Sequence, residues 1–202
     1  MKFHSPGALV LAALLVAPLP SQAQQETASS VIEKFHQTLL SVMKEAESLG
    51  VKGRYERLQS PVTEAFHLPL MIRVAAGRFW KRANPGQRER LLAAFTRMSV
   101  GNYAARFDGY SGQRFVTLGE RPGPGKTRLV ATQIVSPGDD PVDLTYVMKN
   151  IENRWRIGDV LFDNAISELA VRRSEYRRVL KQDGIDGLIA ILEAKARTLV
   201  GN

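Results

Sequence analysis

The sequence has no cysteine and only three histidines among its 202 residues, His4, His36 and His67. The lack of cysteine excludes disulfides, thiol nucleophiles, iron–sulfur clusters and zinc sites with thiolate ligands. Neither His36 nor His67 has a second histidine or a carboxylate at the spacing of a metal motif such as H-E-x-x-H, so we expect no metal site and no cofactor. Little catalytic chemistry is left, which favours a protein that is not an enzyme.

Two short motifs resemble catalytic ones but fail on their spacing. Residues 119–127 (Gly-Glu-Arg-Pro-Gly-Pro-Gly-Lys-Thr) end like a phosphate-binding P-loop, but Glu120 stands where the first glycine belongs, and a strand pattern follows instead of a helix. Residues 109–112 (Gly-Tyr-Ser-Gly) lack the last glycine of a nucleophile elbow, and no later histidine exists to complete a triad. We assign neither segment a catalytic role.

The first 23 residues have the pattern of a signal peptide. Lys2 supplies a positive charge, residues 8–19 form an apolar run too short to span a membrane, and residues 21–23 (Ser-Gln-Ala) place small side chains at the cleavage positions. We predict cleavage after Ala23, which leaves residues 24–202 as a soluble, exported protein.

The formal net charge is +8, from 28 Lys and Arg against 20 Asp and Glu. For an exported protein, the anionic surfaces within reach are membranes and lipid headgroups, so we expect transient contact with membranes and no nucleic-acid partner. Basic residues concentrate near one predicted helix, with only Glu168 and Glu175 to offset them. The candidate docking residues are Arg172, Arg173, Arg177, Arg178 and Lys181. A solvated helix face without a partner is the alternative.

Hydrophobic periodicity divides the exported chain into a mainly helical part (24–108), a sheet (109–162) and closing helices (163–202). The predicted helices cover residues 30–49, 69–81, 85–107, 167–181 and 186–200, and the predicted strands cover 113–119, 127–135, 142–149 and 154–162. This order predicts an α+β fold, a single domain over 24–202. A four-stranded antiparallel sheet is flanked by N-terminal and C-terminal helices, which together enclose a space.

Two predicted helices have clear start signals. The first is expected to begin at a capping box of Ser30 and Glu33 and to stop at Gly50, and the longest begins at Asn84 with Gln87. In the last predicted strand, simple alternation places Ile157 and Val160 on opposite faces of the sheet. Large apolar side chains such as these form either a closed core or the lining of a pocket, and spacing alone leaves both open.

A series of residues runs through 66–202 in a characteristic order: Gly77 with Trp80, Gln87, Phe95, Tyr103, Tyr110-Ser111-Gly112, Tyr146, residues 155–160 (Trp-Arg-Ile-Gly-Asp-Val), Ser167, Arg173, Tyr176, Leu188-Ile189 and Leu192. In this order and spacing, the chain resembles the periplasmic lipid-transport family that includes MlaC and the toluene-tolerance proteins. Residues 163–176 depart from the phospholipid-carrier pattern and look closer to the hopanoid-associated HpnM branch.

The resemblance implies helices that close over a curved sheet around an apolar cavity. It further implies a periplasmic carrier that shuttles a phospholipid or hopanoid-type lipid between membrane systems, with a membrane-embedded lipid transport complex as partner and a role in outer-membrane maintenance. The candidate lipid-binding residues are Phe66, Leu70, Met71, Val74, Phe79, Trp80, Phe95, Tyr103, Phe107, Val130, Ile134, Tyr146, Trp155, Ile157, Val160, Phe162 and Ile166.

Two other functions are compatible with the residues. One is a small-molecule enzyme on a cone-shaped α+β fold, with Asp143 or Asp159 on a strand as general base. The other is an adaptor without a ligand, whose basic helix binds a partner protein.

Overall fold

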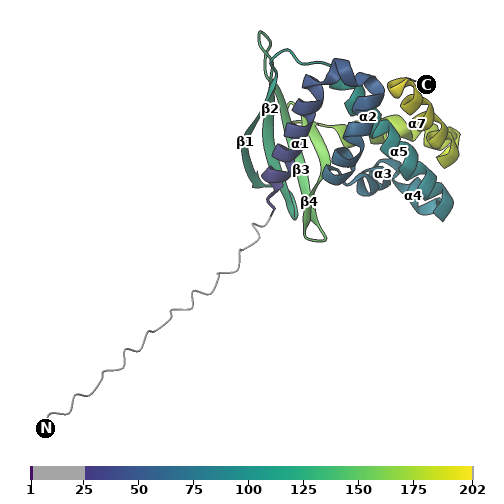
Figure 1. The fold of residues 1–202 in the computed structure, drawn as a ribbon. Coiled ribbons are helices and arrows are strands. Elements are labelled where there is room, and N and C mark those ends of the chain that lie inside the picture. The colour runs from purple at the N-terminus through teal and green to yellow at the C-terminus, as the bar shows by residue number, and fades with distance from the viewer. Residues whose placement is uncertain (2–25, 202) are drawn as a thin grey trace.

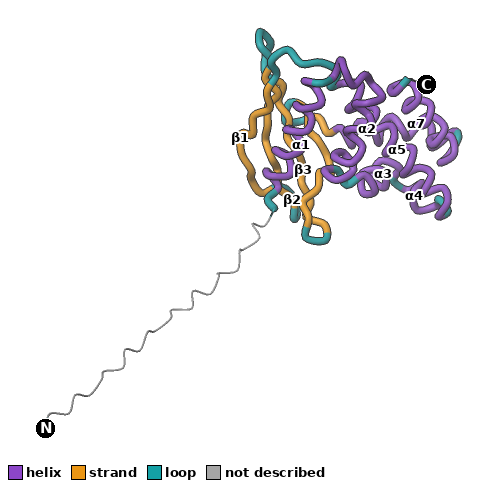
Figure 2. Tube along the Cα trace, in the orientation of Figure 1, coloured by secondary structure: helices purple, strands orange, loops and turns teal. Residues whose placement is uncertain are grey.

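The computed structural model describes Met1 and residues 26–201, in which helices cover one face of an antiparallel sheet (Figures 1 and 2). The predicted signal peptide and its cleavage after Ala23 lie outside the described residues. None of the helices in residues 26–201 combines the length and the apolar character that a membrane span requires.

The sheet is a meander in which each strand pairs with the next along the chain. Its strands are β1 (Arg114–Pro122), β2 (Thr127–Val135), β3 (Val142–Ile151), β4 (Arg154–Phe162) and β5 (Ile166–Ser167). The predicted bounds of β2 and β4 are confirmed, but the prediction of four strands is wrong, because the sheet has five. The fifth strand is two residues long, too short to show an alternating pattern.

Seven helices are described: α1 (Ala28–Lys44), α2 (Ala46–Ala65), α3 (Leu68–Ala76), α4 (Arg78–Arg82), α5 (Pro85–Arg106), α6 (Glu168–Gln182) and α7 (Gly184–Val200). The predicted start of α5 at Asn84 with Gln87 is confirmed, and these two residues form a capping box. The one predicted for α1 is wrong, because Thr27 and Ser30 form it. Gly50, with φ 59° and ψ 179°, interrupts α2 at a kink between two helical segments, so the predicted stop falls at a real break, although α1 itself ends earlier, at Lys44.

A left-handed glycine interrupts the helix predicted over residues 69–81. Gly77 has φ 56° and ψ −128°, a backbone conformation that a residue with a side chain rarely adopts. The break separates α3 from the single-turn α4 and changes the direction of the chain. As a consequence, the residues before and after Gly77 face different surroundings.

A β-bulge at Gly158 changes which side chains of β4 face the helices. The register pairs Val147 with Asp159 but Met148 with Ile157, so Gly158 is left without a partner on β3. Ile157 and Val160 therefore lie on the same, helix-covered face, where both are buried. The prediction that they lie on opposite faces is wrong, because simple alternation takes no account of an extra residue.

The helices form two tiers over the sheet. Helix α1 contacts β1, β2 and β4, and helices α2, α3 and α6 contact β4, while α5 and α7 pack against each other behind them. The junction of α2 and α3 is attached directly to the sheet, because the backbone N–H of His67 donates to the carbonyl oxygen of Ile157 at 2.9 Å. Phe66 forms a bridge with Ile157 at the same point.

Candidate functional site: an apolar pocket between sheet and helices

A pocket of about 210 Å³ lies between the helix-covered face of the sheet and helices α2, α3, α5 and α6. The sheet contributes Ile134, Val142, Leu144, Tyr146, Val160 and Phe162. The helical side contributes Val62, Phe66, Leu68, Met71, Phe95, Ser99, Asn102, Tyr103, Arg106, Phe107, Glu168 and Arg172. Most of these side chains are aliphatic or aromatic, which is typical of a site for an apolar ligand.

Strand register brings the sheet residues of the pocket together. Ile134 pairs with Val142, Leu144 with Phe162, and Tyr146 with Val160, so these side chains stand next to one another on one face. Val142 is 45% exposed, which marks the open end of the pocket at the start of β3.

Aromatic rings form one wall of the pocket. The rings of Phe66 and Tyr103 each pack against Phe35 of α1, with centroids 5.5 and 5.3 Å apart in edge-on geometry. Phe107 stacks on Tyr103 at 5.7 Å. These contacts make the wall apolar and closely packed.

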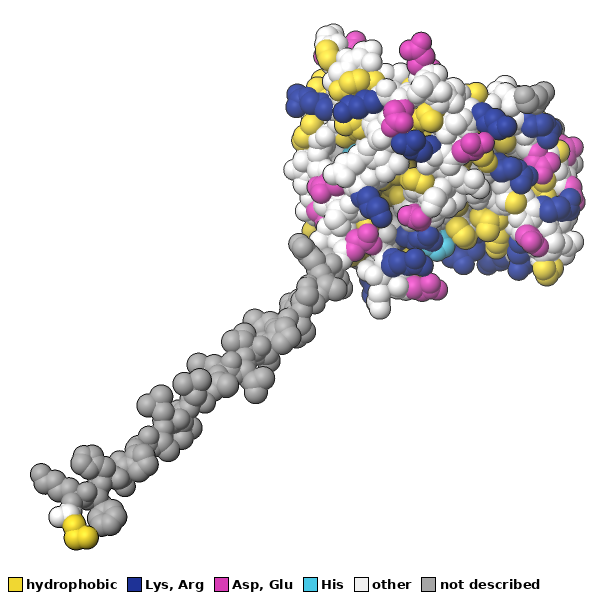
Figure 3. Space-filling view, viewed as in Figure 1, with side chains coloured by type: hydrophobic (Ala, Val, Ile, Leu, Met, Phe, Trp, Pro, Cys, Tyr) yellow, Lys and Arg dark blue, Asp and Glu magenta, His cyan; other side chains and the backbone are white. Residues whose placement is uncertain are grey.

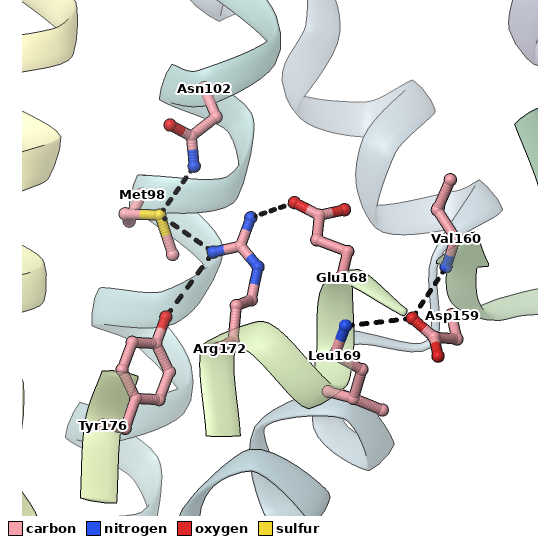
Figure 4. Close-up of polar contacts among 8 residues, drawn as sticks. All are labelled: Met98, Asn102, Asp159, Val160, Glu168, Leu169, Arg172 and Tyr176. Atoms are coloured by element: carbon pink, nitrogen blue, oxygen red, sulfur yellow. Dashed lines mark hydrogen bonds and ion pairs between the residues drawn. The ribbon is translucent and has the colours of Figure 1, made fainter. Parts of the chain in front are cut away.

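A charged pair from α6 borders the same pocket. The Arg172 guanidinium donates from Nη2 to Oε1 of Glu168 at 2.6 Å, one helical turn away, and both side chains are mostly buried. Nη1 of Arg172 lies 3.4 Å from the sulfur of Met98 and 3.5 Å from the hydroxyl of Tyr176 (Figure 4). The guanidinium also lies over the ring of Phe95.

The Arg172 guanidinium stays charged in these surroundings. Burial by itself lowers the pKa of Arg172, but the adjacent Glu168 carboxylate raises it, and the net shift is above the ordinary value. For the Tyr176 hydroxyl, burial raises the pKa, so this group stays protonated at neutral pH. The pocket is therefore apolar over most of its surface, with one neutralised ion pair at its edge.

The buried His36 of α1 contacts Tyr146 of the sheet beside the pocket. Its Nε2 lies 2.9 Å from the hydroxyl of Tyr146, and its ring stacks on Phe115 with centroids 4.4 Å apart. Burial lowers the pKa of His36 to about 4, so the imidazole is neutral at neutral pH. This neutral hydrogen bond orients the Tyr146 ring that lines the pocket.

The structure brings together about half of the predicted lipid-binding residues. Those that line the pocket are Phe66, Met71, Phe95, Tyr103, Phe107, Ile134, Tyr146, Val160 and Phe162. Val130 and Ile157 are buried in the core but do not line the pocket. The others, Leu70, Val74, Phe79, Trp80, Trp155 and Ile166, lie elsewhere.

The predicted residues that do not line the pocket are placed elsewhere by the orientation of α3, the break at Gly77 and the strand β5. Helix α3 turns Leu68, Met71, Ile72, Ala75 and Ala76 inward, which leaves Leu70 half-buried and Val74 exposed. Phe79 and Trp80 follow the break at Gly77, and Trp155 lies in a second cleft beside Phe35. Ile166 belongs to the unexpected strand β5 and is 54% exposed.

Sequence reasoning missed several residues of the pocket. These are Val62, Leu68, Ser99, Asn102, Arg106, Val142, Leu144 and Glu168. The alternation of Val142, Leu144 and Tyr146 in β3 was a signal for two of them. The spacing of Glu168 and Arg172, four residues apart, was a signal for the ion pair.

Only some of the predicted docking residues lie together on the surface. Arg172 points into the protein and lies outside any docking surface, because Glu168 and Met98 hold it there. Arg173, Arg177 and Lys181 line a groove of about 350 Å³ between α6 and the α3–α4 turn, together with Arg78, Phe79 and Leu180. Arg178 is exposed but does not line this groove. Figure 3 shows Lys and Arg side chains gathered along the molecular edge beside α3 and α4.

The two strand aspartates hold secondary structure in place. Asp159 accepts hydrogen bonds from the backbone N–H groups of Val160 and Leu169, at 2.8 and 3.0 Å, and from the hydroxyl of Ser167. Asp143 accepts one from the Gln133 amide at 2.8 Å. Neither lines the pocket. Within residues 26–201, no three His, Asp or Glu side chains gather in a way that could hold a metal ion.

Comparison with known proteins gives two findings. The MlaC protein family matches residues 33–194. Among solved structures, the fold is similar to a phospholipid-binding protein from Ralstonia solanacearum, solved in complex with a phospholipid, with a TM-score of 0.75 and 18% sequence identity. The similarity covers 86% of this chain and 99% of that one. Because the family match extends over most of the sequence, the chain belongs to the MlaC protein family.

Proposed function

We propose that this protein is a lipid-binding carrier that holds the apolar part of a lipid between its sheet and its helices. The observation that carries the proposal is the apolar pocket lined by α2, α3, α5, α6 and the inner face of the sheet, in a chain of the MlaC family. The similar protein from Ralstonia solanacearum, which has the same fold, was solved with a phospholipid bound.

The pocket supplies what lipid transfer requires. Each buried methylene contributes about 0.8 kcal/mol, so a free lipid leaves a membrane for water extremely slowly. A protein that covers the lipid tail with aromatic and aliphatic side chains removes most of that barrier. No nucleophile, metal or redox group is needed for this task.

The volume of the pocket indicates that it widens on binding. An apolar cavity of about 150 Å³ binds one benzene molecule, so the 210 Å³ pocket takes only a short stretch of hydrocarbon. A lipid with full-length chains requires the helical layer to move away from the sheet. The pocket lies at the boundary between these two layers, which is where such a movement opens space.

The proposal includes a cellular setting. We place the carrier in the periplasm, after cleavage of residues 1–23, where it shuttles its lipid between membranes and a membrane-embedded transport complex. The groove of Arg78, Arg173, Arg177 and Lys181 supports transient contact with anionic membrane surfaces. Residues 163–176 support the hopanoid-associated HpnM branch, with a phospholipid as the other lipid class to be tested.

Two substitutions test the binding site as a matched pair. Val160→Trp fills the pocket and should abolish the recovery of co-purified lipid, because Val160 is 3% exposed and lines the pocket. Val74→Trp places the same ring on the exposed side of α3 and should leave lipid binding unchanged. Native mass spectrometry followed by lipid extraction measures occupancy and identifies the lipid as a phospholipid or a hopanoid.

Two results would contradict the proposed function. One is a folded wild-type protein, purified from its membrane-containing source, that carries no lipid and takes up none from vesicles. The other is a Val160→Trp variant that keeps its fold, judged by circular dichroism, and binds lipid as the wild type does.

A further inference from the structure

One buried polar atom at the edge of the pocket has no partner. Among the described residues, Nε of Arg172 is the single buried side-chain nitrogen or oxygen without a hydrogen bond. Buried donors are nearly always paired, because an unpaired one loses its hydration without compensation. An unpaired donor at a binding pocket therefore points to a ligand group that completes it.

The guanidinium is held in a fixed orientation by its other atoms. Nη2 donates to Glu168 at 2.6 Å, and Nη1 contacts the Met98 sulfur and the Tyr176 hydroxyl at 3.4 and 3.5 Å. Figure 4 shows Nε on the side of the guanidinium turned away from Met98 and Tyr176. Both Arg172 and Glu168 line the pocket, so this covered donor lies beside the space that a bound lipid would widen.

The net charge of Arg172 and Glu168 determines whether a charged or a neutral ligand group is favoured beside them. The +1 of Arg172 is balanced by the −1 of Glu168, and the other charged residue of the pocket, Arg106, is solvent-exposed. A buried anion would lose its hydration without a free positive charge to replace it. A neutral oxygen accepts from Nε without that cost, and a hydroxyl can in addition donate to the carboxylate of Glu168.

We propose that Arg172 and Glu168 form a polar anchor that binds an uncharged oxygen of the lipid, a hydroxyl or an ester carbonyl, beside its apolar body. This inference rests on the proposed function and adds to it a chemical class of ligand. The pocket selects a lipid by this oxygen as well as by its hydrocarbon.

Four probes, each with an eight-carbon chain, test the anchor, because they fit a pocket of this size. Octane, octanol, methyl octanoate and octanoate are each used to displace the neutral dye N-phenyl-1-naphthylamine from the purified protein. A hydrogen bond to a charged group corresponds to a roughly tenfold or larger gain in affinity. We expect octanol or methyl octanoate to bind at least tenfold more tightly than octane and octanoate. The stronger of the two identifies the hydroxyl or the ester as the preferred group.

Two variants separate the anchor from general effects on the fold. In Glu168→Gln the positive charge of Arg172 is no longer balanced, so the preference should reverse in favour of octanoate. In the double variant Arg172→Met with Glu168→Gln, octane and octanol should bind equally. Glu175→Gln, the same change at an exposed position of the same helix, should keep the wild-type order of affinities.

A measurement on the unmodified protein gives an independent result. Nitrogen-15 NMR follows the Nε–H resonance of Arg172, which should shift on addition of octanol and stay unchanged with octane. The anchor is refuted if wild-type protein binds octane and octanol equally, or if the double variant keeps the preference. Failure of all four probes to displace the dye would instead overturn the proposed function itself.

Discussion

At the scale of single residues, His36 couples the stability of the protein to pH. Burial lowers its pKa in the folded state to about 4, against about 6.5 in the unfolded chain. The folded protein therefore favours the neutral imidazole. The resulting stability is fully present above pH 6.5 and is lost as the pH falls towards 4. Over this window the loss amounts to about 3 kcal/mol.

The substitution His36→Gln tests this pH dependence. Glutamine keeps a hydrogen-bonding group near Tyr146 but does not titrate, so the variant should lose about 3 kcal/mol less than the wild type between pH 7 and pH 4. Urea unfolding at both values measures the difference. Equal losses in the two proteins would show that protonation of His36 is not responsible.

Asp159 is a second residue with a specific structural role. Its carboxylate joins the end of β4 to the start of α6 through Val160, Ser167 and Leu169. Asp159→Asn removes the charge and one acceptor, which should lower the free energy of unfolding by about 1–3 kcal/mol. The matched change Asp163→Asn, at an exposed turn with φ 48°, should be nearly neutral because asparagine tolerates this conformation.

The same pair of variants tests whether the Asp159 carboxylate is a structural link. Chemical denaturation gives the stability, and lipid extraction gives the occupancy of the folded protein. A variant Asp159→Asn that is as stable as Asp163→Asn would show that the carboxylate is not a structural link.

At the scale of helices and strands, Gly77 determines how α3 and α4 meet. Gly77→Ala forces a side chain into a conformation with φ 56° and ψ −128°, which should cost about 1–3 kcal/mol of stability. Gly86→Ala, in the first turn of α5, meets only ordinary contact with Asn84 and should be neutral or stabilising by up to about 1 kcal/mol. Thermal unfolding checks this. The unfolding temperature should fall in Gly77→Ala and should stay the same or rise in Gly86→Ala.

The elements that could be predicted from the sequence are those with local signals. The cap at Asn84 and the alternation in β2 and β4 correctly predicted where these elements begin. The break at Gly77, the bulge at Gly158 and the strand β5 could not be predicted, because each depends on a partner element or on backbone angles. Local patterns carry no information about such tertiary constraints.

The candidate site was only partly predictable for the same reason. Val74 and Val160 were equal candidates in the sequence, but one is exposed and the other lines the pocket. Helical spacing identifies an apolar stripe, and it does not tell whether the stripe meets another helix, a cavity or solvent. Arg172 is a docking candidate in the sequence, and its burial beside Glu168 depends on tertiary packing that the sequence pattern does not show.

At the scale of the whole molecule, the attachment of the α2–α3 junction to β4 lies between the apolar pocket and a second cleft. On one side is the pocket with Val160 and Phe162, and on the other is a cleft of about 330 Å³ with Phe35 and Trp155. The hydrogen bond from His67 to Ile157 stands between them, in the middle of β4.

We expect this attachment to act as the pivot if the helical layer rotates when a lipid enters the pocket. A rotation that lifts the helices from Val160 to admit a lipid presses them towards Trp155 on the far side. In a Trp80→Phe background, where Trp155 is the remaining tryptophan, lipid binding should therefore shift its fluorescence to shorter wavelength. A spectrum that stays constant while lipid binds would show that the layer moves without a pivot. If the layer does turn about this attachment, filling of the pocket can be observed at Trp155, a residue that does not touch the lipid.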